Sequence, residues 1–502
     1  MSTITATEVI SPLAKNGTPL RRRPVARAAF CGICAGLAAI GFFTPNGLLT
    51  SAAFLVLPAL GFLTWREGEP PVLLLGCCYQ WMQATAAIFY TNHFGQTQEE
   101  AFGSTGLTVA TWLSIIAVVV LGFGIRCGFI GAGGPRRAEL ESDASRLDVN
   151  KVAILYAASF VVAGVLQLVA WRLPSVTQPI LALASLKWGV VFLLCCVVLH
   201  QRRGYGFLLC CLGLEFAMGL FGIFADFKNA FFVLVVATMS SPLALRGRRL
   251  GVSVISFLIL FVLGVTWTAI KTDYREFLAN ADTANEEAIP IERKFGKLAD
   301  LVENLTWDNF TDGLDALILR VSYVNFFALT VENVPARVPF ENGELWKGSV
   351  IHVLTPRFLF PDKPALDDSE RTRLYAGVQV AGTETGTSIG IGYVGESYVD
   401  FGYFWMFVPI FLLGLLYGLI NRFFVTRTRY KLLGSAFAVA ILIFNAYAIE
   451  TSNIKLVGGV VSVALVSVVI YNLFGRTIAN FLAKSPAREA GLRRSAAESR
   501  VA

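Results

Sequence analysis

Long runs of apolar residues alternate with short polar segments along most of the chain. Each run has about 18 to 24 residues, the length that an α-helix needs to cross a ~30 Å hydrocarbon layer. Because backbone polar groups find no water in that layer, each run must be helical. The pattern predicts an all-α polytopic membrane protein with about twelve spans, at residues 27–43, 47–64, 70–90, 107–130, 151–170, 177–199, 205–225, 229–245, 251–270, 401–421, 432–449 and 456–474.

The spans divide the chain into five parts. A tail (1–26) precedes a nine-span bundle (27–270), and a long loop (271–400) separates it from a three-span bundle (401–474) and a basic tail (475–502). Inside the loop, residues 280–290 are predicted to be a solvated linker. Residues 313–331 are amphipathic, with apolar side chains on one helical stripe. We expect an interfacial or re-entrant helix there, because a crossing would move the basic residues after the tenth span to the outer side.

The distribution of Lys and Arg predicts the orientation. Basic residues gather in every second connecting segment, whereas the short segments between them hold only Arg172, Lys228 and Lys455. Since cytoplasmic segments are enriched in Lys and Arg, both termini are predicted to be cytoplasmic and the 271–400 loop to be periplasmic. That loop has a net charge of −9 and the rest of the chain +16. We attribute the positive charge of the rest of the chain to membrane orientation and to contact with anionic lipid headgroups, and not to binding of nucleic acid.

Composition excludes several classes of protein. Only 15% of the residues are charged and 55% are apolar, which is unlike a soluble domain. The nine cysteines lie in or beside apolar runs, where we interpret them as small hydrophobic side chains. No HExxH or phosphate-loop motif is present, so neither a metal centre nor a nucleotide-driven machine is expected. The acidic stretch Asp367, Asp368 and Glu370 is interpreted as a solvated surface.

Two charged residues fall inside predicted spans. Lys187 and Glu215 each lie about ten residues, or ~15 Å, from the outer ends of consecutive antiparallel helices. An unpaired charge at that depth is costly. The sequence therefore predicts an ion pair between them, either structural or part of a path for a lipid phosphate.

Four segments resemble the bacterial O-antigen and exopolysaccharide repeat-unit polymerases, the Wzy-like family. They run from Glu215 to Lys228, from Ala269 to Arg275, from Pro356 to Lys363 and from Ile391 to Tyr403. The resemblance implies a glycosyltransferase-C-like enzyme in the bacterial inner membrane. It would transfer a growing glycan from undecaprenyl pyrophosphate to a new lipid-linked repeat unit at the periplasmic face. It implies no cofactor, and a flippase and a chain-length regulator as candidate partners.

Metal-using enzymes of this type place a carboxylate in the first outer loop. Here that loop, Thr44–Gly47, contains no acid, so we expect a metal-independent enzyme.

Transfer from a pyrophosphate needs positive charge on the leaving phosphates and a base for the acceptor hydroxyl. The base candidates are Glu396 and His352. Tyr393 and Tyr398 are expected to stack on sugars or to lie in the interfacial belt. A helix that starts near residue 393 would place Tyr393, Glu396 and Asp400 on one face. The candidate ligands of the pyrophosphate are Arg357, Arg320, Arg275, Lys363 and Lys271.

Three alternatives stay open at this point. A ligase that hands a finished glycan to another acceptor needs the same basic loop and base. A transporter or lipid-glycan flippase needs a polar path through the spans, of which Lys187 and Glu215 are the main trace. A scaffold for polysaccharide assembly needs no site, and the clustered Arg, Glu and Gly motifs of the loop disfavour it.

Overall fold

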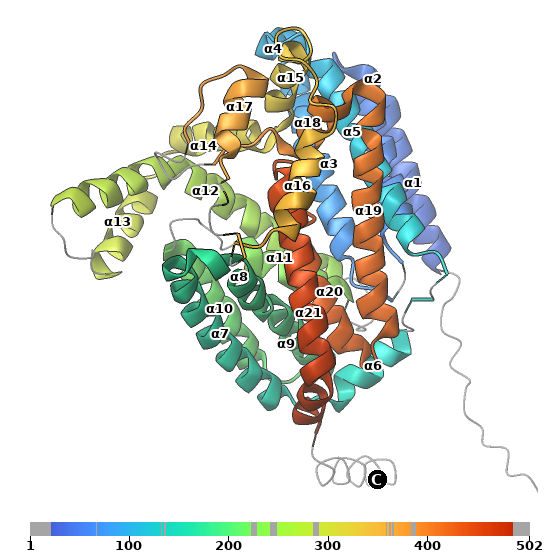
Figure 1. Cartoon of the computed structure of the whole chain (residues 1–502), viewed down its shortest axis with the longest axis vertical. Helices are drawn as coiled ribbons and strands as arrows, with labels where there is room; N and C mark the ends of the chain where they lie inside the picture. The colour runs from blue at the N-terminus through green and yellow to red at the C-terminus, as the bar shows by residue number, and fades with distance from the viewer. Residues whose placement is uncertain are drawn as a thin grey trace, which may run out of the picture.

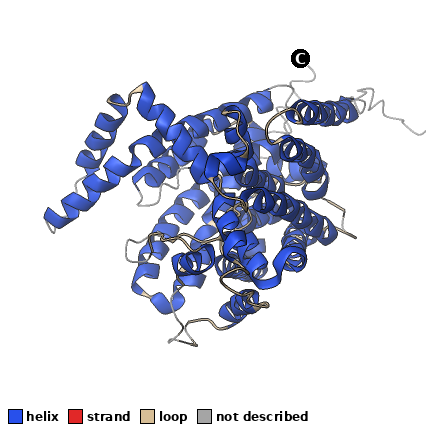
Figure 2. Cartoon of the chain, turned by 90° about the horizontal axis from the view of Figure 1, so that it is seen from above, coloured by secondary structure: helices blue, strands red, loops and turns tan. Residues whose placement is uncertain are grey.

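The structure is a computed structural model of the 502-residue chain. It describes residues 22–66, 68–131, 133–134, 137–221, 228–240, 248–284, 291–357, 359–360, 363, 366–382 and 388–484. Over these ranges the chain forms helices and no β-strand (Figures 1 and 2), with one isolated bridge between Leu147 and Ala483. The all-α prediction is confirmed.

Among the described residues, eight helical segments are long and apolar enough to cross a membrane, which identifies a multi-pass membrane protein. Each coincides with one of the predicted spans. They comprise α2 (Gly47–Thr64), α3 (Val72–His93), α5 (Leu107–Gly128), α7 (Val149–Arg172), α8 (Thr177–Ser185) with α9 (Lys187–Gln201), α12 (Arg248–Ala284), α19 (Phe407–Arg422) and α21 (Asn453–Leu482).

The other four predicted spans coincide with shorter apolar helices. These are α1 (Arg22–Gly41), α10 (Tyr205–Phe221), α11 (Lys228–Ser240) and α20 (Lys431–Leu442). The segments 222–227 and 241–247, which complete two of the predicted spans, lie outside the described residues. Twelve crossings therefore stay a prediction.

Helix α20 ends where the sequence predicts a continuing span, and residues 443–452 are not helical. Side chains of α3 and α19 bond this backbone. Gln80 Nε2 donates to the Ala446 carbonyl at 3.0 Å, Tyr417 donates to the Asn445 carbonyl at 3.1 Å, and the Ile449 N–H donates to Gln83 Oε1 at 2.9 Å. Non-helical backbone is tolerated in a membrane protein where buried side chains satisfy its polar groups.

Helices α5 and α19 pack at unusually short range. A Cβ atom added at Gly124 would lie 2.2 Å from the Phe411 carbonyl oxygen. One added at Gly414 or Gly418 would lie 2.1 Å or 2.4 Å from a carbonyl oxygen of α5. Both helices thus carry a small-xxx-small pattern, Gly124-x₃-Gly128 and Gly414-x₃-Gly418, that permits close backbone approach.

The segment predicted to be a long loop is largely helical. It contains α14 (Trp307–Val321) and α15 (Val324–Asn333), which meet at a bend of 49°. Most of the loop helices lie at the upper end of the molecule in Figure 1. The remaining elements of the loop are α13 (Ile291–Glu303), α16 (Glu344–Leu354), α17 (Asp368–Ala376) and α18 (Gly392–Trp405).

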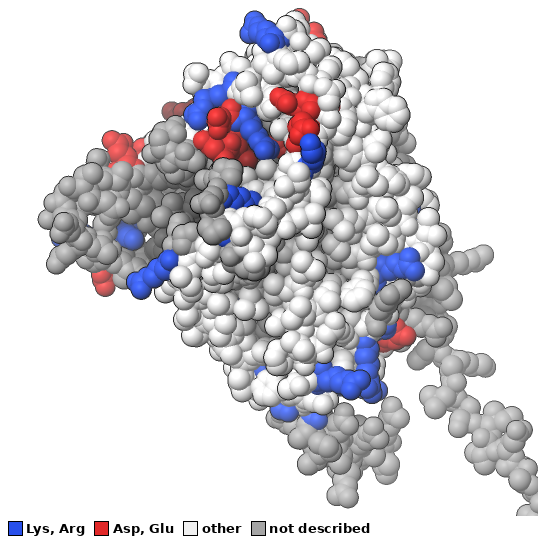
Figure 3. Space-filling view, viewed as in Figure 1, with Lys and Arg blue, Asp and Glu red and all other residues white. Residues whose placement is uncertain are grey.

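Short elements connect the long helices. These are α4 (Gln98–Phe102), α6 (Arg137–Arg146), the 3₁₀ turn η1 (Pro174–Val176) and the π turn η3 (Phe423–Arg427). On the face seen in Figure 3, acidic and basic side chains gather together at the upper end, whereas the lower end carries mainly Lys and Arg.

Several predicted boundaries change. Helix α12 continues to Ala284, so residues 280–284 are helical and not a linker. Helix α21 continues to Leu482, past the predicted start of the basic tail. The expected amphipathic helix at 313–331 is divided between α14 and α15. The rest of the linker, 285–290, and the ends of the chain, 1–21 and 485–502, lie outside the described residues.

Candidate functional site

Helix α18 holds two buried carboxylates one turn apart, and each bonds the start of another helix. Its own start needs glycine, because Gly392 has φ +77 and an added Cβ would lie 2.2 Å from the Ile449 carbonyl oxygen. Glu396 Oε2 accepts the N–H of Asn453, the first residue of α21, at 2.8 Å. Asp400 accepts the N–H groups of Leu345 and Trp346 at the start of α16, at 3.0 and 2.8 Å. These N–H groups have no partner within their own helices.

Arg371 bonds the other oxygen of Glu396. Its Nη1 lies 2.8 Å from Glu396 Oε1, and the Glu396 side chain is only 1% exposed. Burial raises the pKa of Glu396, and the neighbouring Arg371 opposes that shift. The sequence offered Glu396 as the general base. Here both of its oxygens are bonded by protein groups, an arrangement that favours holding Arg371 in place over proton transfer.

Arg371 also belongs to a set of four nitrogen-bearing side chains, which we refer to as the basic cluster: His352, Arg357, Lys363 and Arg371. His352 lies near the end of α16, Arg371 lies on α17, and the other two lie in the segment between these helices. Lys363 donates to the carbonyl oxygens of Thr355, at 2.9 Å, and of His352, which fixes the segment against the end of α16.

The positive charges of the basic cluster act on its own members. Burial lowers the pKa of His352 to about 4, aided by the positive charges of Lys363, Arg357 and Arg371. Burial and Arg357 likewise lower the pKa of Lys363. At neutral pH, His352 is therefore neutral and can accept a proton, while its three neighbours supply positive charge.

The sequence predicts His352, Arg357 and Lys363 as site residues, but not Arg371. Arg371 lies in a stretch interpreted as a solvated acidic surface. Asp368 in that stretch is 8% exposed and pairs with Lys455 at 2.7 Å, which links α17 to the start of α21. Among the described residues, no group of three or more His, Cys, Asp or Glu side chains could hold a metal ion.

Tyr393 and Tyr398 lie in the core rather than at a sugar-binding surface. Both are fully buried. Tyr393 donates to Gln80 Oε1 at 2.7 Å and Tyr398 to the Val334 carbonyl at 2.9 Å. Since neither ring is accessible, the expected stacking on sugars and the alternative place in the interfacial belt do not fit this structure.

The remaining phosphate candidates lie on other elements. Arg320 is exposed on the last turn of α14, and its charge acts on Tyr79 of α3. Lys271 is half-buried on α12. The Arg275 side chain lies outside the described residues. The structure therefore assembles only part of the predicted set.

Lys187 and Glu215 form the ion pair that the sequence predicts. Lys187 Nζ lies 2.7 Å from Glu215 Oε2, and the side chains are 14% and 2% exposed. Lys187 begins α9 at its break from α8 and lies 4.8 Å from the centre of the Trp188 ring. Tyr156 donates a longer bond, 3.3 Å, to Glu215 Oε1. The carboxylate is thus satisfied entirely by protein groups.

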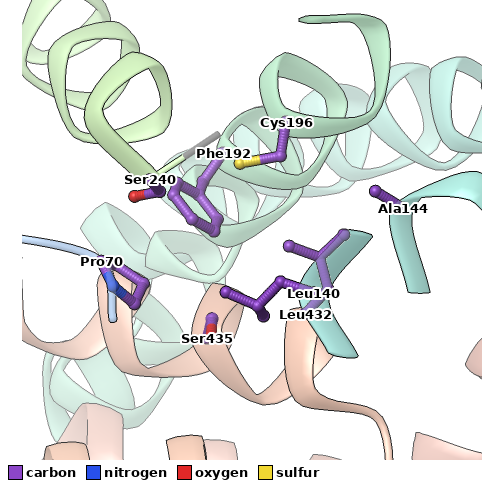
Figure 4. Close-up of a pocket in the computed structure, with 8 residues that line it drawn as sticks. All are labelled: Pro70, Leu140, Ala144, Phe192, Cys196, Ser240, Leu432 and Ser435. Atoms are coloured by element: carbon purple, nitrogen blue, oxygen red, sulfur yellow. The ribbon is translucent and has the colours of Figure 1, made fainter. Parts of the chain in front are cut away.

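A small hollow lies apart from these groups (Figure 4). It is formed mainly by α6, α9 and α20, and none of the predicted site residues lines it. Its polar lining side chains are Ser240 and Ser435. It offers no charged group for chemistry, so the basic cluster is the candidate functional site.

Comparison with known proteins gives one match. No curated protein and no solved structure is similar to the chain. One family covers residues 71–472, a range that includes the basic cluster, the Glu396–Arg371 pair and the Lys187–Glu215 pair. This match covers most of the chain, and the chain therefore belongs to the family described as Domain of unknown function (DUF8712).

Proposed function

We propose that the protein polymerises undecaprenyl-pyrophosphate-linked oligosaccharide repeat units into O-antigen or exopolysaccharide at the periplasmic face of a bacterial inner membrane. The observation that supports this function best is the basic cluster. It combines His352, a candidate base, with Arg357 and Lys363 of the segment that resembles the polymerases, and the positive charges of these two residues and of Arg371 act on His352.

The composition of the basic cluster suits a pyrophosphate leaving group. Arg357 and Arg371 offer planar forks that match phosphate oxygens, and Lys363 adds a compact charge. Positive groups fixed where negative charge develops stabilise the transition state. The bond between the anomeric carbon and the phosphate oxygen breaks, and its electron pair leaves with undecaprenyl pyrophosphate.

His352 is the proposed base in this reaction. The acceptor hydroxyl oxygen forms the new bond to the anomeric carbon, and its proton passes to the neutral imidazole. A nearby anion favours the protonated form of histidine. A bound pyrophosphate therefore raises the low pKa of His352 and makes it a stronger base when the substrate is present.

Glu396 has a supporting role in the same proposal. It bonds Arg371 and the start of α21 at the same time, and it is buried. It therefore holds the guanidinium in place without contacting the reacting atoms.

The test is complementation of a strain that lacks the gene, with the length of lipid-linked glycans measured on gels. Arg357→Ala is compared with Arg337→Ala, which removes an exposed arginine from the same loop. We expect long chains with the wild type and Arg337→Ala, and single repeat units with Arg357→Ala at equal membrane abundance. Unchanged chain length in the deletion strain contradicts the proposal. Accumulation of long lipid-linked chains in that strain points to a ligase instead.

A further inference from the structure

A second group of charged side chains lies outside the basic cluster. Lys228 begins α11, Arg320 lies on the last turn of α14, and Glu450 lies in the non-helical segment after α20. The charges of all three act on the Tyr79 side chain of α3. We refer to Lys228, Arg320 and Glu450 as the α3 cluster. Three elements that are distant in sequence thus bring charges to the same part of α3.

Direct contacts hold two members of the α3 cluster in place. Gln83, one turn after Tyr79, donates from Nε2 to Glu450 Oε2 at 3.2 Å. Lys228 Nζ lies 5.7 Å from the centre of the Tyr447 ring, and that ring lies 5.2 Å from the Tyr79 ring. A cation is attracted to the face of an aromatic ring. Side chains of α3 and its neighbours therefore set the positions of Glu450 and Lys228.

Arg320 lies within the length of a candidate membrane span. Helix α14 runs antiparallel to α12, and a Cβ atom added at Gly264 of α12 would lie 3.6 Å from Leu317 of α14. Gly264 lies near the middle of the candidate span Val254–Tyr274, and Arg320 follows Leu317 by one turn. Arg320 therefore lies beside the interior of the span and not beyond its outer end.

The α3 cluster has an excess of positive charge. Within the part of the chain that the structure describes, Lys228 and Arg320 form no ion pair, and Glu450 supplies a single negative charge. A cation inside a span is costly unless an anion compensates it. Arg320 is exposed and Lys228 is half-buried, so a ligand can reach both. The α3 cluster therefore has the charge and the access that an anion site needs.

An apolar hollow adjoins the α3 cluster. Tyr79 and Tyr447 line it together with Phe232, and the rest of its lining is aliphatic side chains and glycine. Ligand sites combine apolar walls with a few placed polar groups. Apolar walls next to uncompensated cations favour an anion attached to a lipid over a free anion.

The α3 cluster lies close to the candidate functional site. A Cβ atom added at Gly390 would lie 3.4 Å from Asp368 Cβ of α17 and 3.4 Å from the Glu450 carbonyl oxygen. The charges of Glu450 and Glu396 both act on Tyr323, which precedes α15. Glu396 belongs to the pair that holds a guanidinium of the basic cluster. A single side chain, Tyr323, thus connects the neighbourhoods of the two clusters.

We infer that the α3 cluster binds the pyrophosphate of a second lipid-linked molecule, the acceptor of the transfer, through Lys228 and Arg320. The inference rests on the proposed function, because that reaction joins two substrates that each carry undecaprenyl pyrophosphate. The basic cluster holds the pyrophosphate that leaves, and the α3 cluster holds the one that keeps its glycan. No covalent bond forms or breaks at the α3 cluster.

Glu450 makes the α3 cluster the weaker of the two sites. Two cations and one carboxylate leave it a net charge of +1, whereas three cations and the Glu396 carboxylate leave the basic cluster +2. After each transfer the grown chain remains on the acceptor carrier and must move to the basic cluster before the next transfer. Weaker attraction at the α3 cluster favours that movement.

The test counts the undecaprenyl pyrophosphate molecules that bind each full-length chain in detergent, by native mass spectrometry. Lys228→Gln/Arg320→Gln removes both cations, and Lys228→Arg/Arg320→Lys retains both charges. Arg337→Gln is the matched control, because it removes an exposed arginine of the same loop outside both clusters. Thermal unfolding in detergent verifies the fold of each variant.

We expect two bound lipids with the wild type, with Arg337→Gln and with the charge-retaining variant, and one with Lys228→Gln/Arg320→Gln. Glu450→Gln should raise the affinity for the second lipid several-fold, because it removes an opposing charge. One lipid on the wild type, or two on Lys228→Gln/Arg320→Gln, overturns the inference. If removal of both cations prevents folding, Glu450→Gln decides, and unchanged or weaker binding of the second lipid overturns it.

Inorganic pyrophosphate distinguishes a lipid ligand from a free one. It should displace the second lipid only at a large excess, since it cannot use the apolar hollow. Binding of inorganic pyrophosphate at the α3 cluster with no lipid bound there overturns the assignment to a lipid. The polymerase proposal fails separately, if the deletion strain keeps its chain length while the wild type binds two lipids. The second lipid site then stands without its role in transfer.

Discussion

Three carboxylates bond the starts of helices that are distant in sequence. Glu396 and Asp400 are buried and bond the starts of α21 and α16, and the exposed Glu332 bonds the start of α5 through the Gly106 N–H at 2.8 Å. Each removes an unpaired N–H group and places negative charge at the positive end of a helix. At the residue scale, carboxylates such as Glu396 that suggest catalysis in the sequence instead join helices to one another in the structure.

The Arg371–Glu396 pair should respond unequally to removal of its partners. Arg371→Met leaves a buried charge on Glu396 and should cost about 2 kcal/mol or more, because one ion of a buried pair is left uncompensated. Glu396→Gln keeps an acceptor for the Asn453 N–H, and Arg371 is 25% exposed and can reach water, so about 1 kcal/mol is expected.

Thermal unfolding in detergent measures both variants. The double variant Arg371→Met/Glu396→Gln should be more stable than Arg371→Met alone. Strictly additive losses would show that the two side chains are not coupled.

His352 should make stability depend on pH. Its pKa is about 4 in the folded protein against an ordinary value of 6.5. Between these values the unfolded chain binds more protons, so the wild type loses stability as pH falls from 6.5 towards 4. His352→Gln should remove this part of the pH dependence. Inorganic pyrophosphate should reduce it in the wild type, because a bound anion raises the folded pKa. An identical pH profile for wild type and variant would contradict the assignment.

The Lys187–Glu215 ion pair predicts how the protein responds to reversal of either charge. Lys187→Glu or Glu215→Lys alone places two like charges together in the bundle, which should reduce the amount of folded protein severely. The double reversal should restore much of it, measured as monodisperse protein after extraction. Failure of the double reversal would mean that the surroundings, such as Trp188 beside Lys187, fix the direction of the pair.

The candidate site could be predicted from the sequence only in part. Arg357, Lys363 and His352 stand close together in the chain, and a segment rich in proline and basic residues points to them directly. The function of Glu396 depends on Asn453, which is 57 positions away. A local pattern cannot supply such a partner, and for the same reason it could not show that Arg371 belongs to the basic cluster.

At the scale of elements, the α5–α19 contact is the most sensitive junction that the structure identifies. Gly414→Leu should abolish it, because a Cβ atom alone would lie 2.1 Å from the Leu121 carbonyl oxygen. The matched control is Gly61→Leu on α2, where an added Cβ meets nothing within 4 Å. We expect loss of folded protein for the first variant and near wild-type thermal stability for the second. Equal behaviour of the two would show that the close approach contributes no stability.

Hydropathy predicts the existence of the helices well and their ends less well. Every predicted span overlaps a helix within the described residues, since an apolar run in a membrane satisfies most of its backbone polar groups by forming a helix. The end of α20 is different. Residues 443–449 are apolar enough for a span, but Gln80, Gln83 and Tyr417 from other helices bond their backbone and permit the break. Apolarity by itself gives no sign of such side chains.

For the whole molecule, the number of crossings before α16 decides on which side of the membrane α16 lies. Between Ser145 on α6 and Glu344 on α16, the sequence predicts five crossings, an odd number. If α10 and α11 both fail to cross, the number is still odd. It becomes even if only one of them crosses, or if the bent pair α14–α15 crosses as a tenth span instead of re-entering. The register of α14 on α12 favours re-entry, because α14 descends beside Gly264 and α15 then bends away.

The parity of the crossings can be measured with two cysteines. Ser145→Cys and Glu344→Cys both lie at exposed positions, and a membrane-impermeant maleimide reports which side each faces. We expect labelling of Glu344→Cys in intact cells and of Ser145→Cys only after permeabilisation. That result requires an odd number of crossings and places α16, with His352 of the basic cluster, outside. Labelling of both positions from the same side would require an even number. In that case either the bent pair α14–α15 crosses the membrane, or only one of α10 and α11 does. Helix α16 would then lie on the same side as Ser145.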